Sequence, residues 1–407
     1  NARHTLSSSG LRFTMTTTTR PVSDALLGVY RRPPMEFVRG AGVELFDADG
    51  KAYLDFVAGI AVNALGYADE GLDRAMREAL ESGLVHVSNL YRTSPGERLA
   101  EKLVEHSFAD RVFFCNSGAE ANEGAFKMAR RWGRATGGSP KHEIIALRGA
   151  FHGRLFGTLA ATDRPSYRAP FRPLAGGVSI VERDLDELRA ALDPAAVAAV
   201  IAEPVQGEGG VRVLDHEFLR ALRELTRKRG IALILDEIQC GYGRTGTLFA
   251  HEQAGIEPDL LTIAKPMAGG LPMGAVLATK AIADTMQPGD HGTTFGGGPF
   301  VASVGLHIFD RVSDPALLAR VKENGAWLGS SLQSFAGRSS KVRAVRGVGY
   351  MWGIDIVDPA KDVISRALDL GLLVISAGEH TLRLLPPLVA TRNDLERGVV
   401  LLETAIG

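Results

Sequence analysis

The chain has 407 residues, of which 45% are hydrophobic and 23% are charged. A chain of this length and composition can bury a sizeable core and divide into two or three domains, which excludes a disordered protein. The 46 basic and 47 acidic side chains nearly cancel, and no basic run stands out, so we expect no nucleic-acid partner. No apolar run approaches the roughly 20 residues that a membrane-spanning helix needs, so we expect no membrane partner.

Cysteine and histidine usage argues against disulfides and metal sites. Cys115 and Cys240 are too few for a disulfide framework, and neither lies in a spacing that would hold zinc, so we expect a reducing compartment and no metal. The sequence also lacks the motifs of zinc proteases, serine hydrolases and P-loop nucleotidases. Four histidines are isolated and expected to be structural: His86, His142, His152 and His251.

The first 20 residues have a composition of their own. They contain Arg3, Arg12 and Arg20 but no acidic residue, which is typical of an organellar transit peptide. Met15 offers a second start, so residues 1–14 are equally well explained as a remnant of upstream translation. We leave residues 1–20 out of the fold and expect the protein in the cytoplasm, or in an organellar matrix if this leader is a transit peptide.

Short β-branched runs alternate with segments of helical periodicity, which predicts an α/β fold built around a mainly parallel sheet. In such folds ligands bind beyond the carboxyl ends of the strands. The predicted strands are 111–115, 143–147, 197–203, 231–237 and 260–265, and the predicted helices are 71–83, 96–107, 119–132 and 217–230.

The pattern changes near residue 300 to two long helical segments, followed by β-like runs at 342–356 and 372–378. We therefore expect a large domain at 71–298 and a smaller α/β domain at 299–407. Residues 21–70 hold two β-like runs around the turn Asp49-Gly50 and are expected to pack on the smaller domain.

A turn of small residues follows the strand at 111–115. The run 116-NSGAEANE-123 places Ser117, Gly118 and Ala119 where a helix begins, and small residues let backbone N–H groups approach an anion there. By itself an Asn-Ser-Gly turn is more often a plain helix cap. Further ligand-binding residues are needed to favour a phosphate site.

Asp236 ends the predicted strand at 231–237. A buried carboxylate at this edge can keep a pyridine nitrogen protonated, while Gln239 can hydrogen-bond a ring hydroxyl and Ile238 can pack on the ring face. A lone aspartate more often caps a turn, in which case Ile238 and Gln239 are ordinary loop residues.

Lys265 follows a buried strand and precedes Pro266, which stops the strand's hydrogen bonding. Its amine can form a Schiff base and then act as a general base, although most lysines at strand ends are surface residues. Asp236 and Lys265 are 29 residues apart (265 − 236), room for one crossover between neighbouring strands. Together with the anion turn they match the ring nitrogen, aldehyde and phosphate of pyridoxal 5'-phosphate, which predicts this cofactor.

Eight motifs follow one another along the chain: 59-GIAVNALGYA-68, 87-VSNLY-91, 116-NSGAEANE-123, 149-GAFHGR-154, 202-AEPVQGEGG-210, 236-DEIQCGYGRTG-246, 264-AKPMAGGLPMGA-275 and 291-HGTTFGG-297. In sequence and order they resemble those of the class III pyridoxal-phosphate aminotransferases, and most closely of the members that act on N-acetylornithine, within a resemblance that runs from about residue 30 to 400. The resemblance implies the fold-type I architecture, with a mainly parallel seven-stranded sheet in the large domain and a smaller α/β domain. It also implies a homodimer with active sites at the subunit interface.

The resemblance assigns further cofactor contacts. It implies that Phe151 stacks on the pyridine ring, that Gly118 and Ala119 bind the phosphate, and that Thr294 reaches the phosphate of the neighbouring subunit.

Substrate contacts follow from the same resemblance. It implies that Arg154 binds the substrate α-carboxylate through a bidentate pair, assisted by Thr293, and that Glu203 lies close to Arg383. We expect Glu203 to pair with Arg383 and mask it while the amino donor is bound. Outside these motifs, Arg154 and Arg383 would be ordinary surface or structural arginines.

The expected reaction moves the terminal amino group of N-acetylornithine, or a similar acylated diamino acid, to 2-oxoglutarate and gives a semialdehyde and glutamate, in arginine or lysine biosynthesis. Two departures from the family pattern, 266-PMA-268 after the lysine and Gly298 before a proline, leave ornithine or an acetylated lysine as alternative donors.

Two other classes of protein compete with this interpretation. The run 241-GYGRTG-246 matches a dinucleotide-binding fingerprint and would indicate an oxidoreductase, but 247–255 is too short and irregular for the required helix. A binding protein that keeps the fold without the chemistry is the second competitor. Retention of both Lys265 and Asp236 argues against it.

Overall fold

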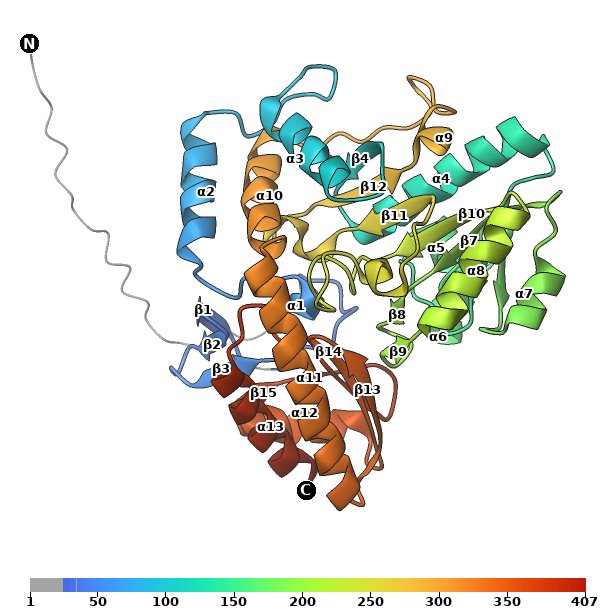
Figure 1. The fold of residues 1–407 in the computed structure, drawn as a ribbon. Coiled ribbons are helices and arrows are strands. Elements are labelled where there is room, and N and C mark those ends of the chain that lie inside the picture. The colour runs from blue at the N-terminus through green and yellow to red at the C-terminus, as the bar shows by residue number, and fades with distance from the viewer. Residues whose placement is uncertain (1–24, 34) are drawn as a thin grey trace, which may run out of the picture.

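The computed structural model describes residues 25–33 and 35–407, and the leader expected at residues 1–20 lies outside them. The chain is built around a sheet of seven strands in the order β4-β12-β11-β10-β7-β5-β6 (Figure 1). The strands span Arg111–Cys115 (β4), Glu143–Leu147 (β5), Val178–Val181 (β6), Val197–Ala202 (β7), Ala232–Asp236 (β10), Leu260–Ile263 (β11) and Gly274–Ala278 (β12).

Six strands of this sheet run in one direction, and β12 is antiparallel to both of its neighbours. The five predicted strands are confirmed. β6 and β12 were not predicted: β6 is short and half-exposed at the sheet edge, and the small residues of β12 follow a Gly- and Pro-rich stretch. The predicted mainly parallel α/β fold is therefore confirmed.

Helices cover both faces of the sheet because side chains along a strand alternate between the faces. In β10, Ile234 packs in one cluster with Ala121 and Ala125 of α4 (Gly118–Gly137). Leu235, on the other face, belongs to the cluster that holds Leu219 and Leu222 of α8 (His216–Lys228). The other helices of this part are α5 (Phe156–Ala160), α6 (Pro165–Arg168), η1 (Ala169–Phe171), α7 (Leu185–Ala191), η2 (Ala250–Ala254), η3 (Lys265–Ala268) and α9 (Lys280–Ala283).

Two four-stranded sheets lie on the same side of the central one (Figure 1), and one of them joins the N-terminal segment to the C-terminal part. β3 pairs in parallel with β15, while β2 and β3 form a hairpin at the predicted Asp49-Gly50 turn. The first small sheet contains β1 (Phe37–Ala41), β2 (Glu44–Asp47), β3 (Ala52–Asp55) and β15 (Leu372–Leu373). The second contains β13 (Val342–Val348), β14 (Met351–Ile356), β17 (Thr381–Leu384) and β16 (Ile375–Ser376), and β8 (Val205–Gln206) pairs with β9 (Arg212–Val213) elsewhere.

Long helices connect these parts. α10 (Pro299–Val312) packs against α2 (Glu70–Glu81) and α3 (Ser94–Glu105), and Arg311 of α10 pairs with Asp69, the N-cap of α2, at 3.0 Å. The remaining helices are α1 (Ala58–Ala61), α11 (Pro315–Arg338), α12 (Ala360–Asp369) and α13 (Arg392–Ile406).

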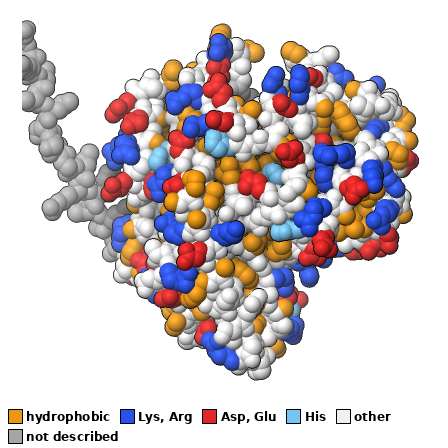
Figure 2. Space-filling view, viewed as in Figure 1, with side chains coloured by type: hydrophobic (Ala, Val, Ile, Leu, Met, Phe, Trp, Pro, Cys, Tyr) orange, Lys and Arg blue, Asp and Glu red, His pale blue; other side chains and the backbone are white. Residues whose placement is uncertain are grey.

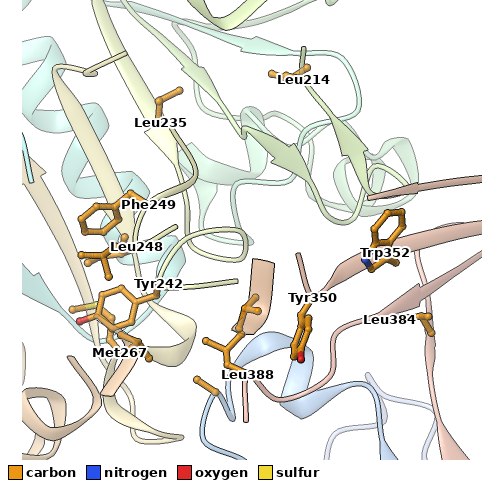
Figure 3. Packing of buried hydrophobic residues seen from close by; sticks show 14 of the residues in the cluster. Leu214, Leu235, Tyr242, Leu248, Phe249, Met267, Tyr350, Trp352, Leu384 and Leu388 are labelled. Atoms are coloured by element: carbon orange, nitrogen blue, oxygen red, sulfur yellow. The ribbon is translucent and has the colours of Figure 1, made fainter. Parts of the chain in front are cut away.

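One hydrophobic cluster extends from the central sheet into the C-terminal part (Figure 3). Tyr242 and Met267, which follow β10 and β11, belong to it together with Tyr350 and Leu388 of the C-terminal part. All four side chains are buried. The loops that follow these two strands are therefore anchored in a packed core.

The surface carries mixed charge. Basic and acidic side chains are interspersed over the face in Figure 2. Among the described residues, no helix is both long and apolar enough to cross a membrane, and no cluster of His, Cys, Asp and Glu could hold a metal ion.

Candidate active site

A cavity of about 420 Å³ opens where β10 and β11 end and α4 begins. Its lining brings together ten of the predicted site residues, from segments up to 148 residues apart in sequence (265 − 117). These ten are Ser117, Gly118, Ala119, Phe151, Arg154, Glu203, Asp236, Ile238, Gln239 and Lys265. Three predicted residues are not part of the lining: Thr293, Thr294 and Arg383.

The N-terminus of α4 forms one end of the cavity. Ser117 caps this helix, and its side chain accepts a hydrogen bond from the Glu120 N–H at 3.3 Å. A Cβ on Gly118 would lie 2.8 Å from the Ile238 side chain, so only glycine fits between the helix and that residue. The first N–H groups of a long helix attract anions, and this end fits a phosphate.

Asp236 is held by three hydrogen-bond donors. Its Oδ2 accepts from Asn122 Nδ2 at 2.7 Å and from His152 Nδ1 at 2.8 Å, and its Oδ1 accepts from the Ile238 N–H at 3.1 Å. Thr262 fixes the Asn122 amide by donating to its oxygen at 2.8 Å. Because a carboxylate offers about four lone-pair sites, Oδ1 keeps one acceptor position for a donor in the cavity. This environment fits a protonated pyridine nitrogen.

The expectation that His152 is an isolated structural histidine is wrong. Its ring is buried against Asp236 and lines the cavity, because residues 149–154 fold over the end of β10. Since a carboxylate only accepts, His152 Nδ1 carries the proton. Its Nε2 is buried and has no hydrogen-bond partner among the described residues.

The loop that carries Phe151, His152 and Arg154 is closed at its base. The Thr162 hydroxyl accepts from the His152 N–H at 3.0 Å, and the Asp163 carboxylate accepts from the Gly149 N–H at 2.8 Å. These two bonds fix the start and the middle of the loop.

Lys265 begins η3 directly beyond β11, as the predicted crossover places it. Burial lowers the pKa of its amine below the ordinary value, and the Asp236 carboxylate acts in the opposite direction. Arg383 adds to the lowering. A lysine with a lowered pKa keeps more of its amine neutral, the form needed for nucleophilic and general-base chemistry.

The expected ion pair between Glu203 and Arg383 is not formed. Arg383 is only 2% exposed, and its Nη2 lies 2.6 Å from Glu208 Oε1 while its Nη1 donates to Gln239 Oε1 at 3.1 Å. Glu208 and Gln239 both line the cavity. The arginine is thus held next to the cavity by a different carboxylate of the same 202–210 motif.

Glu203 instead accepts two backbone hydrogen bonds. Its carboxylate receives the Phe151 N–H at 2.9 Å and the Gly207 N–H at 3.3 Å. Burial raises the pKa of this carboxyl to about 7, beyond the counteracting effect of His152, with Asp236 raising it further. Through its hydrogen bond from the Phe151 N–H, Glu203 joins the end of β7 to the loop that carries Phe151.

The two threonines lie outside the cavity. Thr293 Oγ1 accepts from Asn116 Nδ2 at 3.1 Å, which ties the 291–297 segment to the residue before the Ser117 cap. Thr294 is exposed.

The glycine-rich run 241–246 is a packing segment. Tyr242 is buried, and Arg244 donates to the Tyr350 carbonyl of the C-terminal part at 3.2 Å. Only the short η2 follows, so the helix that a dinucleotide site requires is missing from this segment.

A left-handed turn at residues 58–61 precedes a residue of the cavity lining. Ala58 to Ala61 all have φ between 48° and 67°, which is unfavourable for the non-glycine residues among them. The Asp55 carboxylate holds the turn by accepting from the Val57 and Ala58 N–H groups at 2.8 and 3.0 Å. Val62, the residue after this strained turn, lines the cavity.

Three residues of the site were not predicted from the sequence: Asn122, His152 and Glu208. Each lies inside a motif that the sequence singled out, at 116–123, 149–154 and 202–210. Asn122 follows Gly118 by one helical turn, so it faces the same side of α4, and that spacing was a usable signal. No comparable signal distinguished Glu208 from Glu203.

Comparison with known proteins agrees with this geometry. The family model Aminotransferase class-III matches residues 29–406. The mitochondrial acetylornithine aminotransferase of Alnus glutinosa is 45% identical over 93% of this chain and 84% of its own length. The acetylornithine aminotransferase of Methanocaldococcus jannaschii is 43% identical over 91% of this chain and 93% of its own.

Solved structures are similar as well. The ornithine aminotransferase of Toxoplasma gondii ME49 superposes with a TM-score of 0.89 at 29% identity, covering 94% of this chain and 92% of that one. The N-acetylornithine aminotransferase of Stenotrophomonas maltophilia K279a has a TM-score of 0.80 at 36% identity, with 91% and 95% covered. The chain therefore belongs to the class III aminotransferases, which are pyridoxal-phosphate-dependent enzymes of fold type I.

Proposed function

We propose that this enzyme transfers the terminal amino group of N-acetylornithine, or of a similar acylated diamino acid, to 2-oxoglutarate and so serves arginine or lysine biosynthesis. The observation that carries the proposal is one cavity that combines Lys265 and Asp236 with Arg154. The Arg154 guanidinium contacts aromatic rings and has no carboxylate partner among the described residues. Relatives that are 38 to 45% identical carry the name acetylornithine aminotransferase.

Pyridoxal phosphate, when bound, supplies an aldehyde carbon for the amino group and a ring that withdraws electrons. We assign its phosphate to the N-terminus of α4 at Ser117 to Ala119, and its ring nitrogen to the free acceptor position of Asp236. Phe151 and Ile238 are assigned to the two ring faces, and the Thr294 hydroxyl to the phosphate of the neighbouring subunit.

Lys265 is assigned two tasks. Its amine holds the cofactor covalently between turnovers, and once substrate has displaced it, the neutral amine takes a proton from the amino-bearing carbon of the substrate. The lowered pKa of this buried lysine favours the neutral form that both tasks require.

The two substrates need different charges in the same cavity. A diamino acid that reacts through its terminal amine presents its distant α-carboxylate to Arg154, and we retain Thr293 as a proposed second contact for that carboxylate. Glutamate reacts through its α-amine, so a second carboxylate lies beside the reacting carbon and needs a second cation. We assign that role to Arg383, which Glu208 neutralises at 2.6 Å when no carboxylate competes.

A homodimer is the proposed functional form. The loop after α2 and the 291–297 segment expose Leu90, Tyr91 and Phe295, which are 88%, 71% and 65% accessible. Large apolar side chains gathered beside Thr294 suit a subunit interface. This arrangement supports an active site completed by the second subunit.

The domain division proposed from the sequence is retained, with a cofactor-binding domain at 71–298 and a smaller domain at 299–407 that packs with 21–70. The pairing of β3 with β15 supports it. We also retain a cytoplasmic or organellar location; two relatives, from Alnus glutinosa and Dictyostelium discoideum, carry the word mitochondrial in their names.

A panel of amino donors tests the substrate. The purified holoenzyme is supplied with N-acetylornithine, ornithine, N-acetyl-lysine or succinyl-diaminopimelate, with 2-oxoglutarate as acceptor, and glutamate formation is measured. The highest kcat/KM is expected for N-acetylornithine. A preference for ornithine would instead match the ornithine aminotransferases among the similar structures and overturn the proposal.

A further inference from the structure

Arg154 is the exposed cation of the cavity, and its guanidinium has a defined neighbour. Its Cζ lies 3.6 Å from the ring centroid of Tyr167, directly over the ring face. The second aromatic contact, to Phe151, is longer, with 6.0 Å between Cζ and the ring centroid. Within the described part of the chain, no carboxylate lies within 4.0 Å of this guanidinium and none of its N–H groups donates a hydrogen bond.

Tyr167 contacts two lining residues without lining the cavity itself. Its ring meets Phe151 edge to face, with 6.4 Å between the centroids and an interplanar angle of 84°. The ring is half-buried on the short helix α6, directly beyond the Thr162 and Asp163 bonds that close the 149–154 loop. Tyr167 therefore supports, from outside the cavity, the side chains assigned to the cofactor ring and to the substrate carboxylate.

The geometry has a direct chemical consequence. A guanidinium is planar and its N–H donors point outward within the plane, so a ring on one face leaves every donor free. Stacking restricts the side-chain rotamers, while the absence of an internal carboxylate keeps the charge available. A substrate carboxylate can then bind in the bidentate, in-plane manner that favours arginine.

We propose that Tyr167 is the positioning residue for Arg154 and thereby sets the enzyme's selectivity for amines that carry a distant carboxylate. The inference rests on the proposed function, because it takes Arg154 as the carboxylate-binding residue. Tyr167 acts through Arg154 and touches neither substrate nor cofactor.

The test compares two variants on two amino donors. Tyr167→Leu removes the aromatic face, and Tyr167→Phe keeps it. With the holoenzyme and N-acetylornithine, Tyr167→Leu should raise KM about tenfold with little change in kcat, while Tyr167→Phe stays within about threefold of wild type. With a linear diamine of the same length that lacks the carboxylate, neither variant should change KM.

A double variant separates positioning from general structure. In an Arg154→Gln background, which removes the cation held over the ring, Tyr167→Leu should add no further increase in KM. If Tyr167→Leu does not fold or retain cofactor, Tyr167→Met takes its place in every arm. An equal loss with both donors, or the same added loss in the Arg154→Gln background, shows that the ring is only structural and overturns the inference.

The control for the proposed function is Arg154→Ala. If Arg154→Ala leaves KM for N-acetylornithine unchanged, the assignment of Arg154 itself fails. If Arg154→Ala raises KM strongly but Tyr167→Leu does not, Arg154 keeps its role and only the inference about Tyr167 is overturned.

Discussion

His152 Nδ1 lies 2.8 Å from Asp236 Oδ2, and both side chains are buried beside the cavity. The histidine donates one of the three hydrogen bonds that the carboxylate accepts from the protein. Charge-assisted hydrogen bonds of this kind are stronger than neutral ones, so His152 orients Asp236 and stabilises its charge.

Replacing His152 with Ala should lower kcat about 10- to 100-fold, because it removes one charge-assisted hydrogen bond from Asp236 and leaves a cavity behind the carboxylate. Steady-state rates with the preferred donor measure the effect. His142→Ala, at an exposed histidine, is the matched control and should behave as wild type. An unchanged kcat in His152→Ala would show that the contact has no catalytic consequence.

Asp236→Asn should reduce the rate by roughly a thousandfold or more, because a neutral amide cannot keep the ring nitrogen protonated. The amide also meets donors from both His152 and Asn122, so cofactor affinity should fall as well. Single-turnover rates and a cofactor titration distinguish the two effects. Asp186→Asn, at a side chain that is 89% exposed, serves as the control. A near wild-type rate in Asp236→Asn would remove this residue from the mechanism.

Lys265→Ala should abolish turnover while the fold survives, because both the covalent attachment and the proton transfer are lost. Mass spectrometry after borohydride reduction should find cofactor attached to the wild type but not to the variant. Lys280→Ala, at an exposed lysine, should retain both properties. Appreciable turnover by Lys265→Ala without added amines contradicts the assignment.

Glu208→Gln should change the balance between the two half-reactions. The amide keeps the shape of the side chain but no longer neutralises Arg383, whose guanidinium lies 2.6 Å from the carboxylate. Stopped-flow measurement of each half-reaction should show the glutamate half-reaction speeding up relative to that of the acylated donor by about tenfold, the effect of one charged hydrogen bond. Equal changes in both half-reactions would show that Glu208 does not neutralise Arg383 in one half-reaction only.

Glu203→Gln should alter how stability depends on pH. Burial raises the folded-state pKa of Glu203 to about 7 from its ordinary 4.5. A raised pKa means that this carboxyl contributes stability that is fully present below about pH 4.5 and is lost as the pH rises through about 7. The free energy of unfolding of wild type relative to Glu203→Gln should therefore fall by roughly 2 kcal/mol between pH 5 and pH 7 and change little above pH 8. Urea unfolding at each pH measures it, and a pH-independent difference contradicts the raised pKa.

Local patterns were sufficient for much of the fold. The central strands at 111–115, 143–147 and 232–236 were predicted to within one or two residues, because buried parallel strands are continuous apolar runs bounded by polar residues. β6 and β12 were missed, since a half-exposed edge strand and a strand of small residues lack that signal.

The site, too, has residues that the sequence predicted and contacts that only the structure shows. The sequence by itself predicted Asp236, Lys265 and the turn at Ser117 as parts of one site, because each stands at a strand end or a helix start, and all three line the cavity. Only the tertiary structure decided which side chains meet: His152 with Asp236, Glu208 rather than Glu203 with Arg383, and Tyr167 with Arg154. Glu203 and Glu208 are five residues apart (208 − 203) in one motif, and the choice between them depends on how the turn after β7 aims each carboxylate. That direction is set by the packing of distant segments, which no local pattern records.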